Sequence, residues 1–193
     1  MKVTLNGYTG EFNHPMTVQE LISQLDPVRL DTTLGATSGG TVLELTDTIS
    51  QDIDMRTVDY SDEEGRRIYE RSLRFVLLLA AERCFHDASV RIEHSIGQGV
   101  YFELIGQRMT PDDAVIIEAE MRAIVEHNLP FVKQRWSREK AIEYFEAKGK
   151  YDKSRLLRYR PYDHFDVYTA GGMAEYFYGA MLPATGDVPV FAL

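Results

Sequence analysis

The side chains best suited to bind a metal ion are five histidines and a single cysteine, spread over 193 residues. They are His14, His86, His94, His127, His164 and Cys84. A zinc site needs three or four such ligands that converge on one point, and short motifs usually supply them in pairs. No Cys-x-x-Cys, His-x-x-x-His or His-Glu-x-x-His motif occurs here. The sequence therefore predicts no metal site, isolated histidines in turns or at the surface, and a buried Cys84 that only packs.

Motifs for nucleotide binding and for nucleophilic catalysis are also absent from the sequence. No Gly-x-x-x-x-Gly-Lys-Ser/Thr loop is present, and the glycines of Gly97-Gln98-Gly99 precede a predicted strand, which indicates a hairpin turn. No serine lies in a Gly-x-Ser-x-Gly elbow. We therefore expect no catalytic residue, no nucleoside triphosphate site and no cofactor within these residues.

The formal charge is uneven along the chain, although its sum is −9. Residues 1–60 hold three cations against nine carboxylates, whereas residues 132–160 hold ten cations against four. The negative sum argues against nonspecific nucleic-acid binding, so nucleic acid is not the expected partner, although tRNA stays possible. Phosphate contact is expected only in the second half, where the alternative is a solvated cationic helix face.

No stretch approaches the roughly 20 apolar residues that span a bilayer, and the N-terminus lacks the apolar segment of a signal peptide. A single cysteine excludes an internal disulfide framework. These features predict a cytoplasmic protein without membrane contact.

Short strands around one helix are expected in the first sixty residues. Thr17 and Glu20 form a capping box before an apolar-periodic segment, and Asn6-Gly7 is a hairpin turn signal. The helix is expected at residues 18–25. Strand-like segments are expected at 2–5, 8–12, 34–37 (before a turn at 38–40), 41–45 and 53–58. This order predicts a β-grasp arrangement, with the helix across one face of a mixed sheet.

The remaining residues predict longer helices interrupted by strands. Acidic residues after Asp62 suit the first turn of a helix, and Pro111 suits the first position of another. One expected helix begins at residues 62–65 and contains Cys84 near its end, and the others cover residues 111–127, 138–148 and 152–157. Strands are expected at 89–93, at 100–104 and beyond 161. Both halves together predict an α+β protein.

Three segments carry a resemblance to a known family: Ser61-Asp62-Glu63-Glu64-Gly65, Arg71-Ser72-Leu73-Arg74-Phe75 and Gly99-Val100-Tyr101-Phe102-Glu103-Leu104. Their succession resembles the passage from the TGS domain to the editing domain, or second additional domain, of bacterial threonyl-tRNA synthetases. The resemblance implies a TGS-like β-grasp domain over residues 1–60. It implies, over residues 61–193, an α+β domain like the editing domain of threonyl- and alanyl-tRNA synthetases.

The metal ligands of that family are replaced in this chain. The resemblance places Arg71 and Phe75 where the family has a His-x-x-x-His pair, and Tyr168 and Gly172 where it has a Cys-x-x-x-His pair. It therefore implies an editing-type scaffold without the metal set that editing chemistry would use.

The resemblance also implies a cleft that could hold a ligand. Lys153 matches a lysine of the family's cleft, and Asp166 precedes the replaced cysteine by two residues. The candidate pocket residues are Arg71, Phe75, Lys153, Asp166 and Tyr168. Its two cations would favour a small anionic ligand. In the alternative, a salt bridge between Arg71 and Asp166 closes the cleft.

The C-terminal residues carry a second resemblance. The run 176–186, from Tyr176 to Gly186, and the ending 190–193 are similar to bacterial uridine kinase-like (nucleoside kinase) proteins. This implies a noncatalytic regulatory or ligand-binding region, covalently linked to a kinase domain beyond residue 193 that would use ATP and Mg²⁺. The alternatives are the TGS and editing region of a divergent threonyl-tRNA synthetase acting on mischarged tRNA, and a free-standing binding module.

Overall fold

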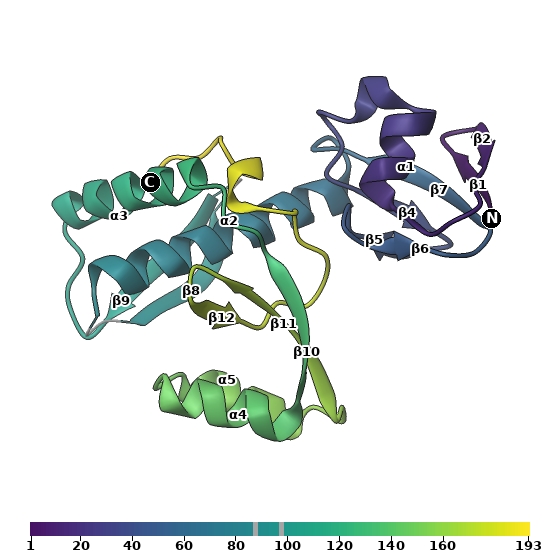
Figure 1. Ribbon diagram of the computed structural model, residues 1–193. Coiled ribbons are helices and arrows are strands. Elements are labelled where there is room, and N and C mark those ends of the chain that lie inside the picture. The colour runs from purple at the N-terminus through teal and green to yellow at the C-terminus, as the bar shows by residue number, and fades with distance from the viewer. Residues whose placement is uncertain (87–88, 97–98) are drawn as a thin grey trace. The chain divides into compact units, whose positions relative to one another are not determined.

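The computed structural model describes residues 1–86, 89–96 and 99–193, which form two compact units (Figure 1). The first unit contains Met1–Pro130 and Gly179–Leu193, and the second is Phe131–Tyr178. Both units combine helices with strands, which confirms the predicted α+β class. The predicted division at residues 60 and 61 follows the family resemblance rather than these units, and it stays a prediction.

The N-terminal part of the first unit is a mixed five-stranded sheet with one helix, α1 (Val18–Leu25). Strand β1 runs parallel to β7 and antiparallel to β2, and β4 is antiparallel to both β5 and β7. In sheet order the strands are β2 (Tyr8–Glu11), β1 (Lys2–Leu5), β7 (Ile53–Val58), β4 (Gly35–Ser38) and β5 (Thr41–Leu43). A short pair, β3 (Met16–Thr17) and β6 (Thr48–Ile49), and the 3₁₀ turn η1 (Pro27–Arg29) complete this part.

Local sequence signals account for the turn and the helix here. Asn6 and Gly7 have φ values of 51° and 90°, the left-handed values that a two-residue hairpin turn needs, and they join Leu5 to Tyr8. The backbone N–H of Thr17 donates to the Glu20 carboxylate at 2.7 Å, which closes the predicted capping box. The apolar side of α1 then packs on β1 and its neighbours in one core.

Two long helices, α2 (Glu63–Cys84) and α3 (Pro111–Glu126), lie side by side in the rest of the first unit (Figure 1). A hairpin of β8 (Ser89–Ile96) and β9 (Gly99–Ile105) connects them. Helix α3 begins as predicted, because Thr110 and Asp113 form a capping box ahead of it. The predicted turn at Gly97-Gln98-Gly99 lies partly outside the described residues.

The C-terminal segment Gly179–Leu193 returns to these two helices. The backbone N–H of Leu182 donates to Ser72 Oγ at 2.9 Å, and Thr185 Oγ1 donates to the carbonyl of Ile124 at 2.8 Å. Tyr69 donates to the carbonyl of Val190 at 2.8 Å. The segment contains the 3₁₀ turn η2 (Thr185–Asp187), and buried side chains such as Met181 and Val188 add to these hydrogen bonds.

The second unit is a three-stranded antiparallel sheet with two helices on one side (Figure 1). Its elements are β10 (Val132–Ser137), α4 (Arg138–Ala147), α5 (Tyr151–Tyr159), β11 (His164–Ala170) and β12 (Met173–Glu175). Phe145 of α4 and Leu157 of α5 pack against Phe165 and Val167 of the sheet. The helices and β11 confirm the sequence predictions. Strand β10 is one that the sequence does not predict, and four of its six residues are exposed without alternation.

None of the helices in the described part of the chain has the length and apolar character that crossing a bilayer requires.

Candidate functional site

The predicted pocket residues belong to both units. Arg71 and Phe75 lie on α2 in the first unit, whereas Lys153 lies on α5 and Asp166 and Tyr168 lie on β11 in the second. A single pocket of all five, and the alternative pair of Arg71 with Asp166, therefore stay predictions.

In the first unit, the guanidinium of Arg71 donates a hydrogen bond to the carbonyl of Ala180. The preceding residue, Gly179, has a φ of 119°, and a Cβ there would lie 2.8 Å from the Arg71 guanidinium carbon. The backbone angle therefore favours glycine, and a side chain at this position would also force the end of Arg71 to shift. Phe75, one turn further along α2, is completely buried. In this geometry Arg71 anchors the C-terminal segment and Phe75 packs.

Arg71→Ala is expected to loosen the segment Gly179–Leu193. This hydrogen bond is partly buried and has a charged donor; such a bond contributes about 1.5–3 kcal/mol, so its loss should expose the amides of that segment to exchange. Hydrogen exchange with mass spectrometry should show faster exchange there, with little change in the second unit. Arg67→Ala is the matched control, because Arg67 lies on the same helix but is half-exposed and pairs with Glu63 and Glu64 of that helix. Unchanged exchange in Arg71→Ala would contradict the anchoring role.

In the second unit, the fully buried carboxylate of Glu175 is surrounded by two lysines. Lys153 forms an ion pair with one carboxylate oxygen, and Lys150 Nζ lies 3.4 Å from the other. The backbone N–H of Tyr176 also donates to this carboxylate, at 2.9 Å. The Lys150 and Lys153 side chains are 18% and 34% exposed. Two lysines thus share one buried carboxylate, and both lysine side chains reach solvent in part.

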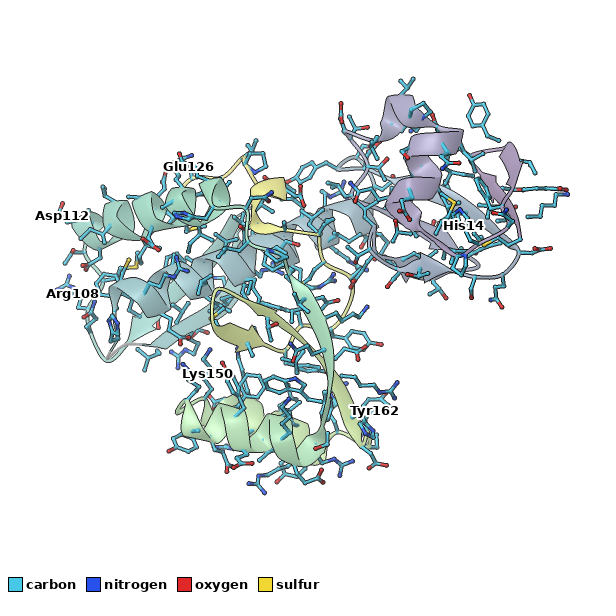
Figure 2. All side chains as sticks on the ribbon, viewed as in Figure 1. His14, Arg108, Asp112, Glu126, Lys150 and Tyr162 are labelled. Atoms are coloured by element: carbon cyan, nitrogen blue, oxygen red, sulfur yellow. The ribbon has the colours of Figure 1, made fainter. Side chains whose placement is uncertain are left out.

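Secondary structure brings these three groups together. Lys150 and Lys153 are one helical turn apart at the start of α5, so they reach toward the same side. Lys150 and Tyr162 lie near opposite ends of the layer that α4 and α5 form (Figure 2). Glu175 is the last residue of the edge strand β12, opposite Tyr168 of β11. Sequence reasoning found Lys153 but missed Glu175 and Lys150, because a lone glutamate after a short strand gives no signal.

The two other predicted residues of this unit have contrasting environments. Tyr168 is 1% exposed, and the Lys133 ammonium lies 5.9 Å from its ring centroid. Asp166 is exposed and lies opposite Arg135 in the sheet register. Of the three residues predicted here, only Lys153 therefore belongs to the Lys150–Lys153–Glu175 cluster.

The metal-capable side chains of the described residues do not gather, since no three His, Cys, Asp or Glu groups are placed as ligands of one ion. Cys84 is partly exposed rather than buried, because it is the last residue of α2, so the packing prediction was wrong in that respect. Partial burial and the nearby Glu120 carboxylate raise the pKa of the Cys84 thiol, which makes it a poor nucleophile at neutral pH.

No protein-family profile matches the chain. It is 30% identical to a threonine–tRNA ligase of Symbiobacterium thermophilum over 194 aligned residues, which include 99% of this chain. It is 28% and 29% identical to the threonine–tRNA ligases of Burkholderia lata and Herminiimonas arsenicoxydans over 97% of its length. The chain spans 30% of the length of each of these relatives. These similarities support a relation to the N-terminal region of threonyl-tRNA synthetases, and they give no support to the kinase hypothesis.

Proposed function

We propose that this chain is a TGS-like β-grasp and editing-like region, related to that of threonyl-tRNA synthetases, which binds tRNA without hydrolysing its aminoacyl ester. The observation that carries the proposal is the similarity to threonine–tRNA ligases along nearly the whole chain. The mixed sheet with α1 across it is compatible with the β-grasp part.

The charge distribution supports tRNA contact through the second unit. That unit holds ten lysines and arginines against seven carboxylates, whereas the rest of the chain holds eleven against 23. Phosphate contacts supply much of the affinity for nucleic acid, and they need cations on the surface that approaches it. The second unit, at +3, meets this need, and the first, at −12, does not.

The side chains at the replaced ligand positions support binding without hydrolysis. Hydrolysis of an aminoacyl ester needs a water molecule activated by a general base or a metal ion. A guanidinium remains protonated at any physiological pH, and Arg71 is already bonded to Ala180. Phe75 has no titratable group, and Tyr168 is buried. None of these three residues can activate water.

We expect the chain to bind the tRNA that accepts threonine, with an affinity that falls steeply as salt rises. For contact with several phosphates, the slope of log K against log salt should be about −0.7 to −0.9 for each phosphate contact. Filter binding over a salt series measures this slope. No binding at low salt would refute the proposal.

The second half of the proposal is tested by deacylation. The half-life of seryl-tRNA should be the same with the chain as in buffer alone. Accelerated loss of serine would show hydrolysis and contradict that half only, leaving tRNA binding intact.

A further inference from the structure

Helix α5 exposes two tyrosines and an arginine in one row. Tyr151, Arg155 and Tyr159 are each four residues apart, so they lie on successive turns of the same helix face. Tyr151 is 63% exposed, Tyr159 is 83% exposed, and the side chain of Arg155 is 70% exposed. The buried residues of the helix, Ser154 and Leu157, lie on its other side. We call Tyr151, Arg155 and Tyr159 the α5 row.

The fold does not use the two tyrosine rings. Neither ring belongs to the core of the second unit, which α4, α5 and the sheet form without them. Among the described residues, neither ring stacks on another aromatic side chain or takes part in a cation–π contact. Two large aromatic side chains on one solvent face, without a structural role, suit a binding surface.

The sequence around the α5 row is rich in cations. Residues 148–160 contain six lysines and arginines and a single carboxylate, that of Asp152, although Lys150 and Lys153 pair with Glu175 from outside this segment. Asp152 lies 4.0 Å from Arg155, a weak pair in which both side chains are mostly exposed. Arg158 is engaged with Glu146 at 2.7 Å, on the side of α4. Arg155 is thus the cation placed between the two tyrosines.

Aromatic side chains interleaved with cations match single-stranded nucleic acid. Unpaired bases stack on aromatic rings whatever their sequence, and phosphates pair with the cations between them. A duplex keeps its bases stacked inside and offers none to a flat surface. Tyr151 and Tyr159 are separated by eight residues, about 12 Å along the helix axis, which leaves room for Arg155 to reach a phosphate between two stacked bases.

We propose that the α5 row binds single-stranded nucleic acid, with bases stacked on Tyr151 and Tyr159 and a phosphate paired with Arg155. The inference rests on the proposed function and deepens it, because it specifies unpaired nucleotides as the part of the tRNA that the second unit contacts. The observations behind it are the exposure, spacing and charge of α5, which differ from those behind the proposed function, so each can be tested by its own variants.

The test is fluorescence anisotropy of the full chain with a labelled ten-nucleotide oligouridylate. Tyr159→Ala should weaken binding about tenfold, since loss of one stacked base costs about 1–3 kcal/mol and 1.4 kcal/mol corresponds to a factor of ten. Tyr159→Phe keeps the ring and should bind as the wild type does. Tyr8→Ala is the matched control, because Tyr8 is 57% exposed on the acidic N-terminal sheet and its loss should change nothing.

Arg155→Gln tests the phosphate contact separately. Its salt slope should be smaller than that of the wild type by about 0.7, the value for one phosphate on a single strand. Arg67→Gln, which removes a half-exposed arginine of the first unit, should leave the slope unchanged.

The outcomes separate this inference from the proposed function. If tRNA binds but Tyr159→Ala and Arg155→Gln change neither tRNA nor oligouridylate binding, the α5 row is wrong and the proposed function stands. If oligouridylate binding depends on Tyr159 while tRNA does not bind, the inference about the α5 row stands and the proposed function is wrong. A duplex of the same length, or vesicles with anionic headgroups, should bind more weakly than the oligouridylate. Equal affinity would show that charge alone drives binding, and it would overturn the inference.

Discussion

Replacement of Glu175 by alanine is expected to destabilise the second unit by about 3 kcal/mol, near the lower end of the range for breaking a buried ion pair. The carboxylate is completely buried and compensates Lys150 and Lys153 together. Without it, two ammonium groups share a site that excludes most water, and the Tyr176 N–H loses its acceptor. The partial exposure of both lysines keeps the cost from being larger.

Urea unfolding followed by tryptophan fluorescence measures this effect directly. The only tryptophan of the chain, Trp136, belongs to the second unit and is 7% exposed, so its emission reports unfolding of that unit. Glu146→Ala is the matched control: this carboxylate pairs with Arg158 at the surface of the same unit, and its loss should cost less than about 1 kcal/mol. Glu175→Ala with the same midpoint as the wild type would show that the lysines do not depend on the carboxylate.

The sequence predicts well those elements whose determining interactions are all made between residues close to one another in the sequence. The cap of α1 needs only Thr17 and Glu20, and the first hairpin needs only Asn6 and Gly7. Both partners of each interaction lie within a few residues of each other, so the residue types at those positions are enough to predict it. Helix α3 follows the same logic, because Thr110, Pro111 and Asp113 specify its start.

Strand β10 could not be predicted, because its extended conformation depends on pairing with residues that lie far away in the sequence. Val132 and Lys133 are exposed, yet they pair with Thr169 and Tyr168 across more than thirty residues of sequence. A strand whose exposed residues do not alternate gives no periodic signal. Its place depends on β11, the central strand of that sheet.

The candidate site shows the same limit. Arg71 and Lys153 were identified through the resemblance, but the groups they meet, the Ala180 carbonyl and the Glu175 carboxylate, lie 109 and 22 residues away. Every residue has a backbone carbonyl, so the sequence cannot indicate which one accepts a hydrogen bond, and a glutamate is usually a surface residue. The resemblance indicates which positions matter, whereas the structure shows that a backbone carbonyl engages Arg71 and a carboxylate engages Lys153.

Gly65→Ala is expected to destabilise the first unit by about 3 kcal/mol, as severe overpacking does. Helix propensity alone predicts the opposite, a gain of roughly 1 kcal/mol for this change inside a helix. Gly65 is buried in the first turn of α2, and a Cβ there would lie 2.6 Å from the carbonyl carbon of Asp59 and closer still to its oxygen. The contact is with backbone, so no side chain can rotate away.

The backbone of Asp59 has little freedom to move. Its carbonyl accepts from the Asp62 N–H at 3.1 Å, and its N–H donates to the Asp62 carboxylate at 3.1 Å. Its own carboxylate accepts from Ser61 N at 2.8 Å, and the hydrogen bonds from Ser61 lower the pKa of Asp59. This turn joins β7 to α2, so an added methyl group must displace one of them from the other.

The thermal unfolding of Gly65→Ala, followed by circular dichroism, tests the sign of the effect. Gly40→Ala is the control for an added methyl group without a clash, because a Cβ at Gly40 meets no atom within 4 Å; unlike Gly65, Gly40 has a positive φ, 84°. It should lose only the backbone preference of glycine, about 1 kcal/mol. If Gly65→Ala melts at a higher temperature than the wild type, helix propensity outweighs the steric clash. The turn between β7 and α2 can then move enough to accommodate the added methyl group. A fall larger than that of Gly40→Ala would show that steric fit to Asp59, rather than helix propensity, determines the residue at this position.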